Sequence, residues 1–179
     1  VICGRREEKL KKVKKEIGSA CSYIQADITK QKDRKRAVSF AVKHGNGLDA
    51  LVNNAANMYR APLDKLEEEK LIEIFQSNVI SSMMLSSLCL PHLQKSKGAI
   101  VFLSSVHTRR SFSGASPYAA SKGAIETLTR VLASELGPSG VRVNCVVPGA
   151  VPSEINQRAG LFNEKETKKR LNDLISEHR

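Results

Sequence analysis

The sequence has 179 residues, of which 41% are hydrophobic and 26% are charged, and its net charge is +11. This length and balance are typical of one globular domain, and no apolar stretch approaches the roughly 20 residues that a membrane-spanning helix needs. A basic surplus can indicate nucleic-acid binding, but acidic residues are interleaved with the basic ones and few aromatic residues could stack on bases, so we expect neither a membrane protein nor a nucleic-acid binder.

The four cysteines and the four histidines are scattered along the chain. No Cys-x-x-Cys pair occurs, which favours reduced thiols in a cytoplasmic protein over disulfides, and no ligand spacing predicts a metal site. The chain begins at Val1, already inside an apolar run, and no signal peptide is visible. We therefore expect the natural N-terminus to lie upstream of this residue.

The first half of the chain alternates short apolar runs with longer helical patterns. Strands are expected at Val1–Cys3, Ser22–Ala26 and Leu48–Val52, and helices at Arg6–Ile17 and Lys30–His44. A Gly-Asn-Gly triplet follows the second of these helices and is expected to end it.

The second half continues the alternation. A long helical region is expected over Leu63–Leu93, ending after Pro91, and a further helix over Pro117–Leu136. Apolar strands are expected at residues 98–104 and 141–146. Strands that alternate with helices predict parallel βαβ units, so the fold class is α/β with a doubly wound parallel sheet. Ligands of such sheets bind beyond the carboxyl ends of the strands.

The segment Tyr118-Ala-Ala-Ser-Lys122 places a phenol and an ammonium one helical turn apart, on the same helix face. A tyrosine with its ordinary pKa near 10 is a poor acid or base at neutral pH, but a nearby cation lowers that pKa. The pair could then exchange a proton with a carbonyl or alcohol. The alternative interpretation is a surface tyrosine packed on a lysine stem.

Two more polar residues stand where chemistry is plausible. Ser105 follows an apolar strand, so its hydroxyl is expected at the carboxyl edge of the sheet, although it could serve only as a cap at the strand end. Asn78 lies inside a helix, where asparagine is locally unfavourable. Its alternative interpretation is a buried amide whose hydrogen bonds are satisfied.

Six motifs in order resemble the short-chain dehydrogenase/reductase family, in its compact single-domain type. They are Asp27-Ile-Thr, Leu51-Val-Asn-Asn-Ala-Ala56, Asn78, Ile100-Val-Phe-Leu-Ser-Ser105, Tyr118-Ala-Ala-Ser-Lys122 and Val143-Asn-Cys-Val-Val-Pro-Gly149. The resemblance implies that residues 1–179 form a single, partial, Rossmann-like NAD(P)-binding domain. It also implies an oxidoreductase that transfers hydride between a nicotinamide cofactor and a small-molecule carbonyl or secondary alcohol, and a homo-oligomer for the full-length protein.

The resemblance assigns four catalytic residues. Tyr118 would be the general acid or base, and Lys122 would lower its pKa and bond to the nicotinamide ribose. Ser105 would hydrogen-bond the substrate oxygen. Asn78 would hold a water molecule that links Lys122 to solvent as a proton relay.

Cofactor contacts follow from the same resemblance. On the adenosine side, Asp27 would accept from the adenine amino group and Ile28 would contact it through its backbone. Asn54, Ala55 and Ala56 would line this side as well, with Ala56 standing where the family usually has glycine.

On the nicotinamide side, Pro148, Gly149 and Val151 would border the ring. Ser153 stands where the family often has threonine. Residues 153–179 would form the segment that covers the substrate.

The residues after the first strand bear on the choice of cofactor. NAD enzymes tend to have an acid here, whereas Arg5 and Arg6 suit a 2′-phosphate, which guanidinium groups bind in bidentate fashion. We therefore expect NADP(H) rather than NAD(H). Alternatively, the two arginines only begin a charged helix.

The chain departs from the family pattern at both ends. No glycine-rich turn for the pyrophosphate occurs, so we expect the first βα unit and the last strand to be missing and the chain to be a fragment. Because the family's first strand lies in the middle of the sheet, its loss predicts two sheet fragments, whose edge strands either pair directly with each other or stay open. The alternative function is thus a catalytically inactive, truncated chain that acts as an interaction subunit.

The loop between Ser105 and Tyr118 carries His107, Arg109 and Arg110. These residues could favour an anionic or acyl-carrier substrate. Exposed loop charge is the plainer interpretation.

Overall fold

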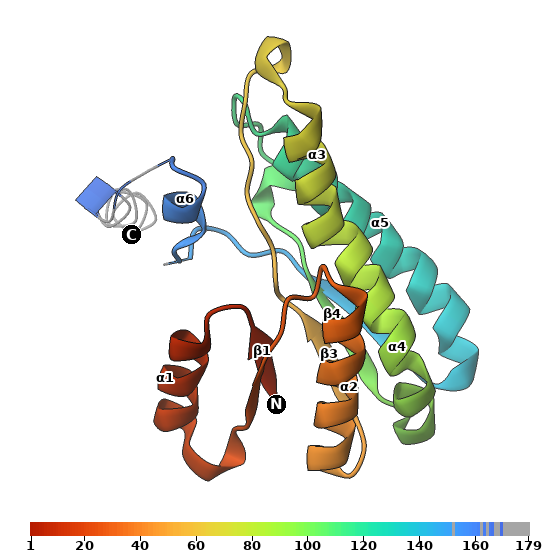
Figure 1. The fold of residues 1–179 in the computed structure, drawn as a ribbon. Coiled ribbons are helices and arrows are strands. Elements are labelled where there is room, and N and C mark those ends of the chain that lie inside the picture. Colours follow the sequence, from red (N-terminus) through yellow and green to blue (C-terminus); the bar gives the residue numbers. More distant parts are fainter. Residues whose placement is uncertain (152, 162, 164, 167–168, 170–179) are drawn as a thin grey trace, which may run out of the picture.

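The computed structural model describes residues 1–151, 153–161, 163, 165–166 and 169. Its elements are strands that alternate with helices (Figure 1). The strands are β1 (Ile2–Gly4), β2 (Tyr23–Gln25), β3 (Ala50–Asn53), β4 (Ala99–Leu103) and β5 (Arg142–Val146). The α-helices are α1 (Glu7–Ile17), α2 (Gln31–Gly45), α3 (Glu68–Phe75), α4 (Ser81–Ser96), α5 (Ser116–Leu136) and α6 (Ile155–Arg158). Short 3₁₀ turns occur at Gly18–Ala20, Leu63–Lys65, Val106–Thr108 and Gly137–Ser139, and a π-helix at Gln76–Ile80.

All strand pairs are parallel, which confirms the α/β class, and they form two sheets. One sheet pairs β1 with β2, and the other has the order β3-β4-β5. The two expected sheet fragments are therefore observed. Figure 1 shows β1 and α1 on one side of the molecule, with the larger sheet and helices α2, α4 and α5 on the other.

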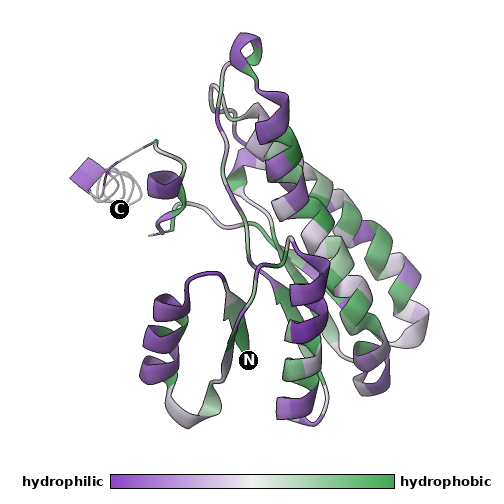
Figure 2. Ribbon diagram, viewed as in Figure 1, coloured by the Kyte–Doolittle hydropathy of each residue, from purple (hydrophilic) through white to green (hydrophobic). Residues whose placement is uncertain are grey.

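The larger sheet is covered by helices on one face. Burial alternates along β3 and β5, as expected when successive side chains point to opposite faces. Ile100 and Phe102 of β4 pack with buried residues of α2, α4 and α5, and Phe102 has no exposed surface. On the opposite face, Val52 is 58% exposed and Val146 is 51% exposed. Figure 2 shows a further contrast between helices, with hydrophobic colour along much of α4 and α5 and hydrophilic colour over most of α1.

One expected element was partly wrong. The long helix predicted over Leu63–Leu93 starts as a separate 3₁₀ turn, and its regular part runs from Glu68 to Ser96 with a π-helix inside. Pro91 does not end it, because proline removes only one helical hydrogen bond and Leu93, which has no exposed surface, holds the next turn in the core. The other predicted strands and helices agree within two residues at each end.

Candidate active site

The site lies at the carboxyl edge of the larger sheet, where the loops after β4 and β5 are joined. The backbone N–H of Ser104 donates to the carbonyl of Val146 at 2.8 Å, and that of Val106 donates to the carbonyl of Pro148 at 3.1 Å. Parallel strands end at the same edge, so residues that are far apart in the chain meet here.

Helix α5 brings Tyr118 and Lys122 to this edge. Pro117 in the first turn suits a helix start, since a proline there loses no helical hydrogen bond. Both side chains are buried, with only 6% of Tyr118 and 4% of Lys122 exposed. The ammonium Nζ of Lys122 donates to the carbonyl of Leu103 at 2.8 Å and lies 5.8 Å from the centroid of the Tyr118 ring. The surface-tyrosine interpretation is therefore wrong.

Burial dominates the electrostatics of this pair. It lowers the pKa of Lys122 to about 8, because an ammonium is costly to desolvate. It also raises the pKa of Tyr118, against which a hydrogen bond with Ser105 acts in the lowering direction. In this arrangement the phenol is a weaker acid than in water, contrary to the expectation that Lys122 lowers its pKa.

Asn78 is buried in the π-helix between α3 and α4, and π-helical turns occur frequently at functional sites. Its side-chain amide donates to the carbonyl of Asn57 at 2.9 Å and to Ser121 Oγ at 3.0 Å. Its Oδ1 accepts from the backbone N–H of Asn57 at 2.7 Å and from Ser77 Oγ at 3.0 Å. Asn78 thus joins the loop after β3 to helix α5, as a satisfied buried amide would. Its role in a water relay stays a prediction.

Ser105 is buried and accepts a hydrogen bond from the backbone N–H of His107 at 3.3 Å, so it also caps the 3₁₀ turn Val106–Thr108. Its Oγ lies 3.1 Å from His107 Nδ1. The His107 ring is half-buried, lies against the Phe112 ring at a 30° tilt with centroids 4.3 Å apart, and meets the Tyr118 ring edge-to-face at 5.2 Å. Exposed loop charge, the interpretation offered for this histidine, is therefore wrong.

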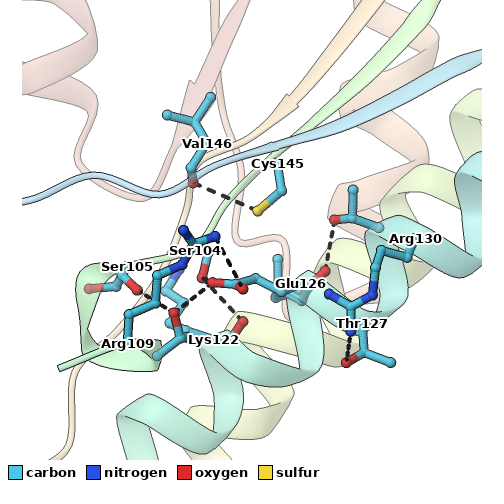
Figure 3. A network of polar contacts seen from close by, with 12 residues as sticks. Ser104, Ser105, Arg109, Lys122, Glu126, Thr127, Arg130, Cys145 and Val146 are labelled. Carbon is cyan, nitrogen blue, oxygen red and sulfur yellow. Dashed lines mark hydrogen bonds and ion pairs between the residues drawn. The ribbon is translucent and has the colours of Figure 1, made fainter. Parts of the chain in front are cut away.

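Glu126 of α5 binds side chains of the loop after β4, the segment that carries Ser104 and Arg109 (Figure 3). Its Oε1 accepts from Ser104 Oγ at 2.7 Å and from Thr108 Oγ1 at 2.6 Å, and Arg109 Nη2 lies 4.0 Å from its Oε2. Hydrogen bonds from Thr108 and Ser104, with the charge of Arg109, lower its pKa although partial burial opposes them. Sequence reasoning missed this residue. Its position one turn after Lys122 on the same helix face was the available signal.

The predicted phosphate-binding cations belong to the smaller sheet. Arg6 forms an ion pair with Glu154, and Lys9 Nζ bonds the same carboxylate at 2.8 Å. Lys9 and Arg6 together lower the pKa of Glu154 to about 2. Arg5 forms no ion pair with a described residue and lines a cavity of about 360 Å³. Glu154 was not foreseen in the sequence.

That cavity is lined mainly by polar side chains. It collects four cationic residues and one carboxylate at the boundary between the loop after β3, helix α3 and helix α6; these are Arg5, Arg60, Lys70, Arg158 and Glu73. Burial, with repulsion from Arg6 and Arg5, lowers the pKa of Arg158. The excess of positive charge makes this a favourable place for an anion.

The residues predicted for the adenosine side are divided between the two sheets. Asp27, after β2, accepts from Thr29 N at 3.0 Å and Oγ1 at 2.7 Å. Burial opposes ionisation of this carboxyl, but these bonds outweigh it and lower its pKa. The carbonyl of Ile28 already accepts a bond from Arg34. On the larger sheet, the loop after β3 exposes Asn54 and Ala55 and half-buries Ala56.

The residues predicted for the nicotinamide side follow β5. Pro148 is fixed by its bond to Val106, whereas Gly149 is exposed and Val151 is 60% exposed. Ser153 Oγ accepts from the backbone N–H of Ile155 at 3.4 Å, just before α6. Most of the predicted substrate-covering segment, 153–179, lies outside the described residues.

Two negative findings concern the described residues alone. The described residues include no group of His, Cys, Asp and Glu side chains that could bind a metal ion. None of their helices is both long and apolar enough to cross a membrane.

Comparisons with known proteins agree on the family and the fold. The family profile described as "short chain dehydrogenase" matches residues 1–163. L-fucose dehydrogenase from Bos taurus is 34% identical over 154 residues, which are 84% of this chain and 56% of that protein. The chain spans a little over half the length of the curated relatives it matches.

Solved structures show the same similarity. A 3-ketoacyl-(acyl-carrier-protein) reductase from Brucella melitensis, complexed with NADH, has a TM-score of 0.80 at 29% identity, covering 83% of this chain and 64% of that one. A gluconate 5-dehydrogenase from Burkholderia cenocepacia, in complex with NADP and tartrate, has a TM-score of 0.79 at 26% identity, covering 92% and 66%.

Proposed function

Because this chain belongs to the short-chain dehydrogenase family, we propose that it carries the catalytic centre of an NADP-dependent carbonyl reductase or secondary-alcohol dehydrogenase. The observation that carries this proposal is the buried pair of Tyr118 and Lys122 beside Ser105 at the carboxyl edge of the larger sheet. A buried phenol close to a cation and a second hydroxyl is suited to move a proton to or from an oxygen atom.

The proton chemistry falls to Tyr118. When bound, the nicotinamide cofactor supplies or accepts the hydride, and the Tyr118 phenol gives its proton to the substrate oxygen in reduction or takes it back in oxidation. Ser105 holds that oxygen with a hydrogen bond. Lys122 is cationic below its pKa of about 8, so near neutral pH its charge is available to counteract the effect of burial on the Tyr118 phenol.

Asn78 would support this chemistry from the π-helix. It binds Ser121, which donates in turn to the carbonyl of Tyr118 at 2.7 Å. We place on Asn78 the water relay to Lys122 that the family resemblance implies.

The cation cluster at the end of β1 favours NADP over NAD. Arg5 and Arg6 directly follow β1, where the family resemblance puts the 2′-phosphate, and Lys9, which pairs with Glu154, is a third cation nearby. Asp27, Ile28, Asn54, Ala55 and Ala56 would contact the adenosine, and Pro148, Gly149, Val151 and Ser153 the nicotinamide. Solved relatives are described with NADH and with NADP, so the preference rests on this chain's own cations.

We further propose that the full-length protein is cytoplasmic and forms a homo-oligomer. The four cysteines are all free thiols, as is usual in a reducing compartment. Exposed apolar residues along α3 to α5 offer a surface for association, among them Ile72, Met83 and Val131.

The deciding experiment is carbonyl-dependent oxidation of NADPH and NADH by the full-length protein against a panel of small aldehydes and ketones. We expect activity with NADPH that Tyr118→Phe abolishes. Tyr23→Phe is the matched control, because Tyr23 lies on β2 and bonds only weakly to Glu7, at 3.4 Å. Activity that survives Tyr118→Phe would refute the mechanism.

A second candidate function is an inactive chain that acts as an interaction subunit. The observation that favours it is the division into two sheets, with Val52 and Val146 exposed on one face of the larger sheet. Titration of the 179-residue chain with NADPH separates the two candidates. Micromolar binding would exclude the inactive subunit.

A further inference from the structure

His107 stands in the site next to two of the proposed catalytic residues. Its Nδ1 is 3.1 Å from Ser105 Oγ, and its ring lies against the Tyr118 ring. The backbone N–H of His107 binds the same oxygen. This histidine is therefore placed to control the Ser105 hydroxyl.

Counting protons at Ser105 Oγ decides how it does so. The hydroxyl has one proton to donate and can accept two hydrogen bonds. To hold the oxygen of a substrate carbonyl, as proposed above, Ser105 must donate this proton to it. That bond uses the only hydroxyl proton, so the contact with His107 must run from Nδ1–H to Oγ.

Resting on the proposed function, we propose that His107 is a positioning residue whose Nδ1–H donates to Ser105 Oγ. This turns the single serine proton into the site, toward the Tyr118 oxygen in the free protein and toward the substrate oxygen once substrate is bound. The backbone N–H of His107 fills the second acceptor position. With both acceptor positions filled, the serine proton is directed into the site. Donation to Oγ also polarises the hydroxyl and makes it a better donor.

The surroundings keep this histidine neutral. Tyr118 on α5 and Arg60 on the loop after β3 are the titratable or charged groups that face the ring, and its own segment continues with Arg109 and Arg110. Burial, reinforced by Arg60, lowers the pKa of His107. The Nδ1–H tautomer of the neutral ring can act as the donor across the neutral and alkaline range.

Two substitutions distinguish the effect of the His107 N–H donor from the effect of its aromatic ring. His107→Asn keeps an N–H donor close to the Nδ1 position but removes the aromatic ring. His107→Phe keeps a ring against Phe112 and Tyr118 but removes the donor. Phe112→Leu is the matched control, because it removes the neighbouring aromatic ring and leaves both His107 nitrogens in place.

The first readout is the titration of Tyr118, followed by ultraviolet absorbance of tyrosinate as a difference from Tyr118→Phe. We expect His107→Phe to raise the pKa of Tyr118 by roughly half a unit to one unit, the worth of about one hydrogen bond. His107→Asn and Phe112→Leu should leave it near the wild-type value. An unchanged or lowered pKa in His107→Phe would overturn the proposal.

The second readout is catalysis by the full-length protein. We expect His107→Phe to reduce kcat for carbonyl reduction about tenfold, and His107→Asn to restore most of it. Equal losses in both variants would show that the ring matters rather than the nitrogen, and would overturn the proposal. If the wild-type protein reduces no carbonyl, the proposed function fails, whereas the tyrosine titration still decides the role of His107.

The unmodified protein offers a check that needs no variant to fold. The ¹⁵N chemical shift of His107 Nδ1 distinguishes a protonated from a bare ring nitrogen. A protonated Nδ1 at neutral pH supports the proposal, and a bare one contradicts it.

Discussion

The two sheets of this chain arise from the same alternation of strand and helix, yet they are held together very differently. The larger sheet packs on α2, α4 and α5, and α4 alone contributes six buried residues. The smaller sheet packs on α1, whose buried residue is Leu10, and its cations reach the segment after β5 through Glu154. The proton-transfer residues thus stand on a well-packed framework, and the predicted phosphate-binding cations stand on a lightly packed one.

The largest difference between the two regions should appear on truncation of a core side chain. We expect Phe102→Ala, in the larger sheet, to lower the free energy of unfolding by about 3–5 kcal/mol. Leu10→Ala, in the helix that packs on the smaller sheet, should lower the free energy of unfolding by less, about 2 kcal/mol, because fewer groups surround Leu10. Chemical denaturation measures both losses. A larger loss in Leu10→Ala would contradict the contrast in packing.

Removing the side-chain amide of Asn78, which joins the loop after β3 to α5, should have the next largest effect on the free energy of unfolding. Asn78→Ala leaves the backbone groups of Asn57 without their partner, and we expect a loss of about 2–3 kcal/mol. Amide hydrogen exchange at Asn57 should accelerate at the same time. Unchanged exchange there would mean that Asn78 does not hold this loop.

Glu126 should make a smaller contribution to the free energy of unfolding, and this contribution should depend on pH. Glu126→Gln removes the charge that Ser104, Thr108 and Arg109 stabilise, and we expect a loss of about 1 kcal/mol at neutral pH.

The sign of this pH dependence follows from the lowered pKa of Glu126. A carboxyl whose folded pKa is below its unfolded value stabilises the fold above the unfolded value and loses that contribution as pH falls through the folded one. The difference between wild type and Glu126→Gln should therefore shrink in acid. Glu135→Gln, at an exposed position on the same helix, is the control and should show no such trend.

The smallest effect on stability should come from Glu154. Its ion pairs with Arg6 and Lys9 are largely exposed, and such pairs contribute little to folding. Glu154→Gln should leave denaturation unchanged but free two cations for a phosphate, so we expect NADPH to bind several-fold more tightly at low salt. Weaker NADPH binding in this variant would show that Glu154 helps to hold the cofactor rather than competing with it.

Local sequence patterns predicted most of the fold. Hydrophobic periodicity placed the strands and helices to within two residues, apart from the segment that contains Pro91, where burial of Leu93 outweighed the local effect of proline. The spacing of Tyr118 and Lys122 placed both on one face of α5, because that geometry is fixed within a single helix. Their catalytic roles stay predictions.

The sequence by itself determined the order of elements, the parallel α/β class and the motifs of the family. Only the tertiary structure decided the partners of the side chains. Lys122 binds the carbonyl of Leu103, and His107 lies between Ser105 and Tyr118. Glu126 accepts from Ser104, and Glu154 pairs with Arg6. The reason is that periodicity and spacing report which side of its own element a residue faces. Most of these contacts join elements that are distant in the chain, and the burial they create sets the pKa values of Tyr118 and Lys122.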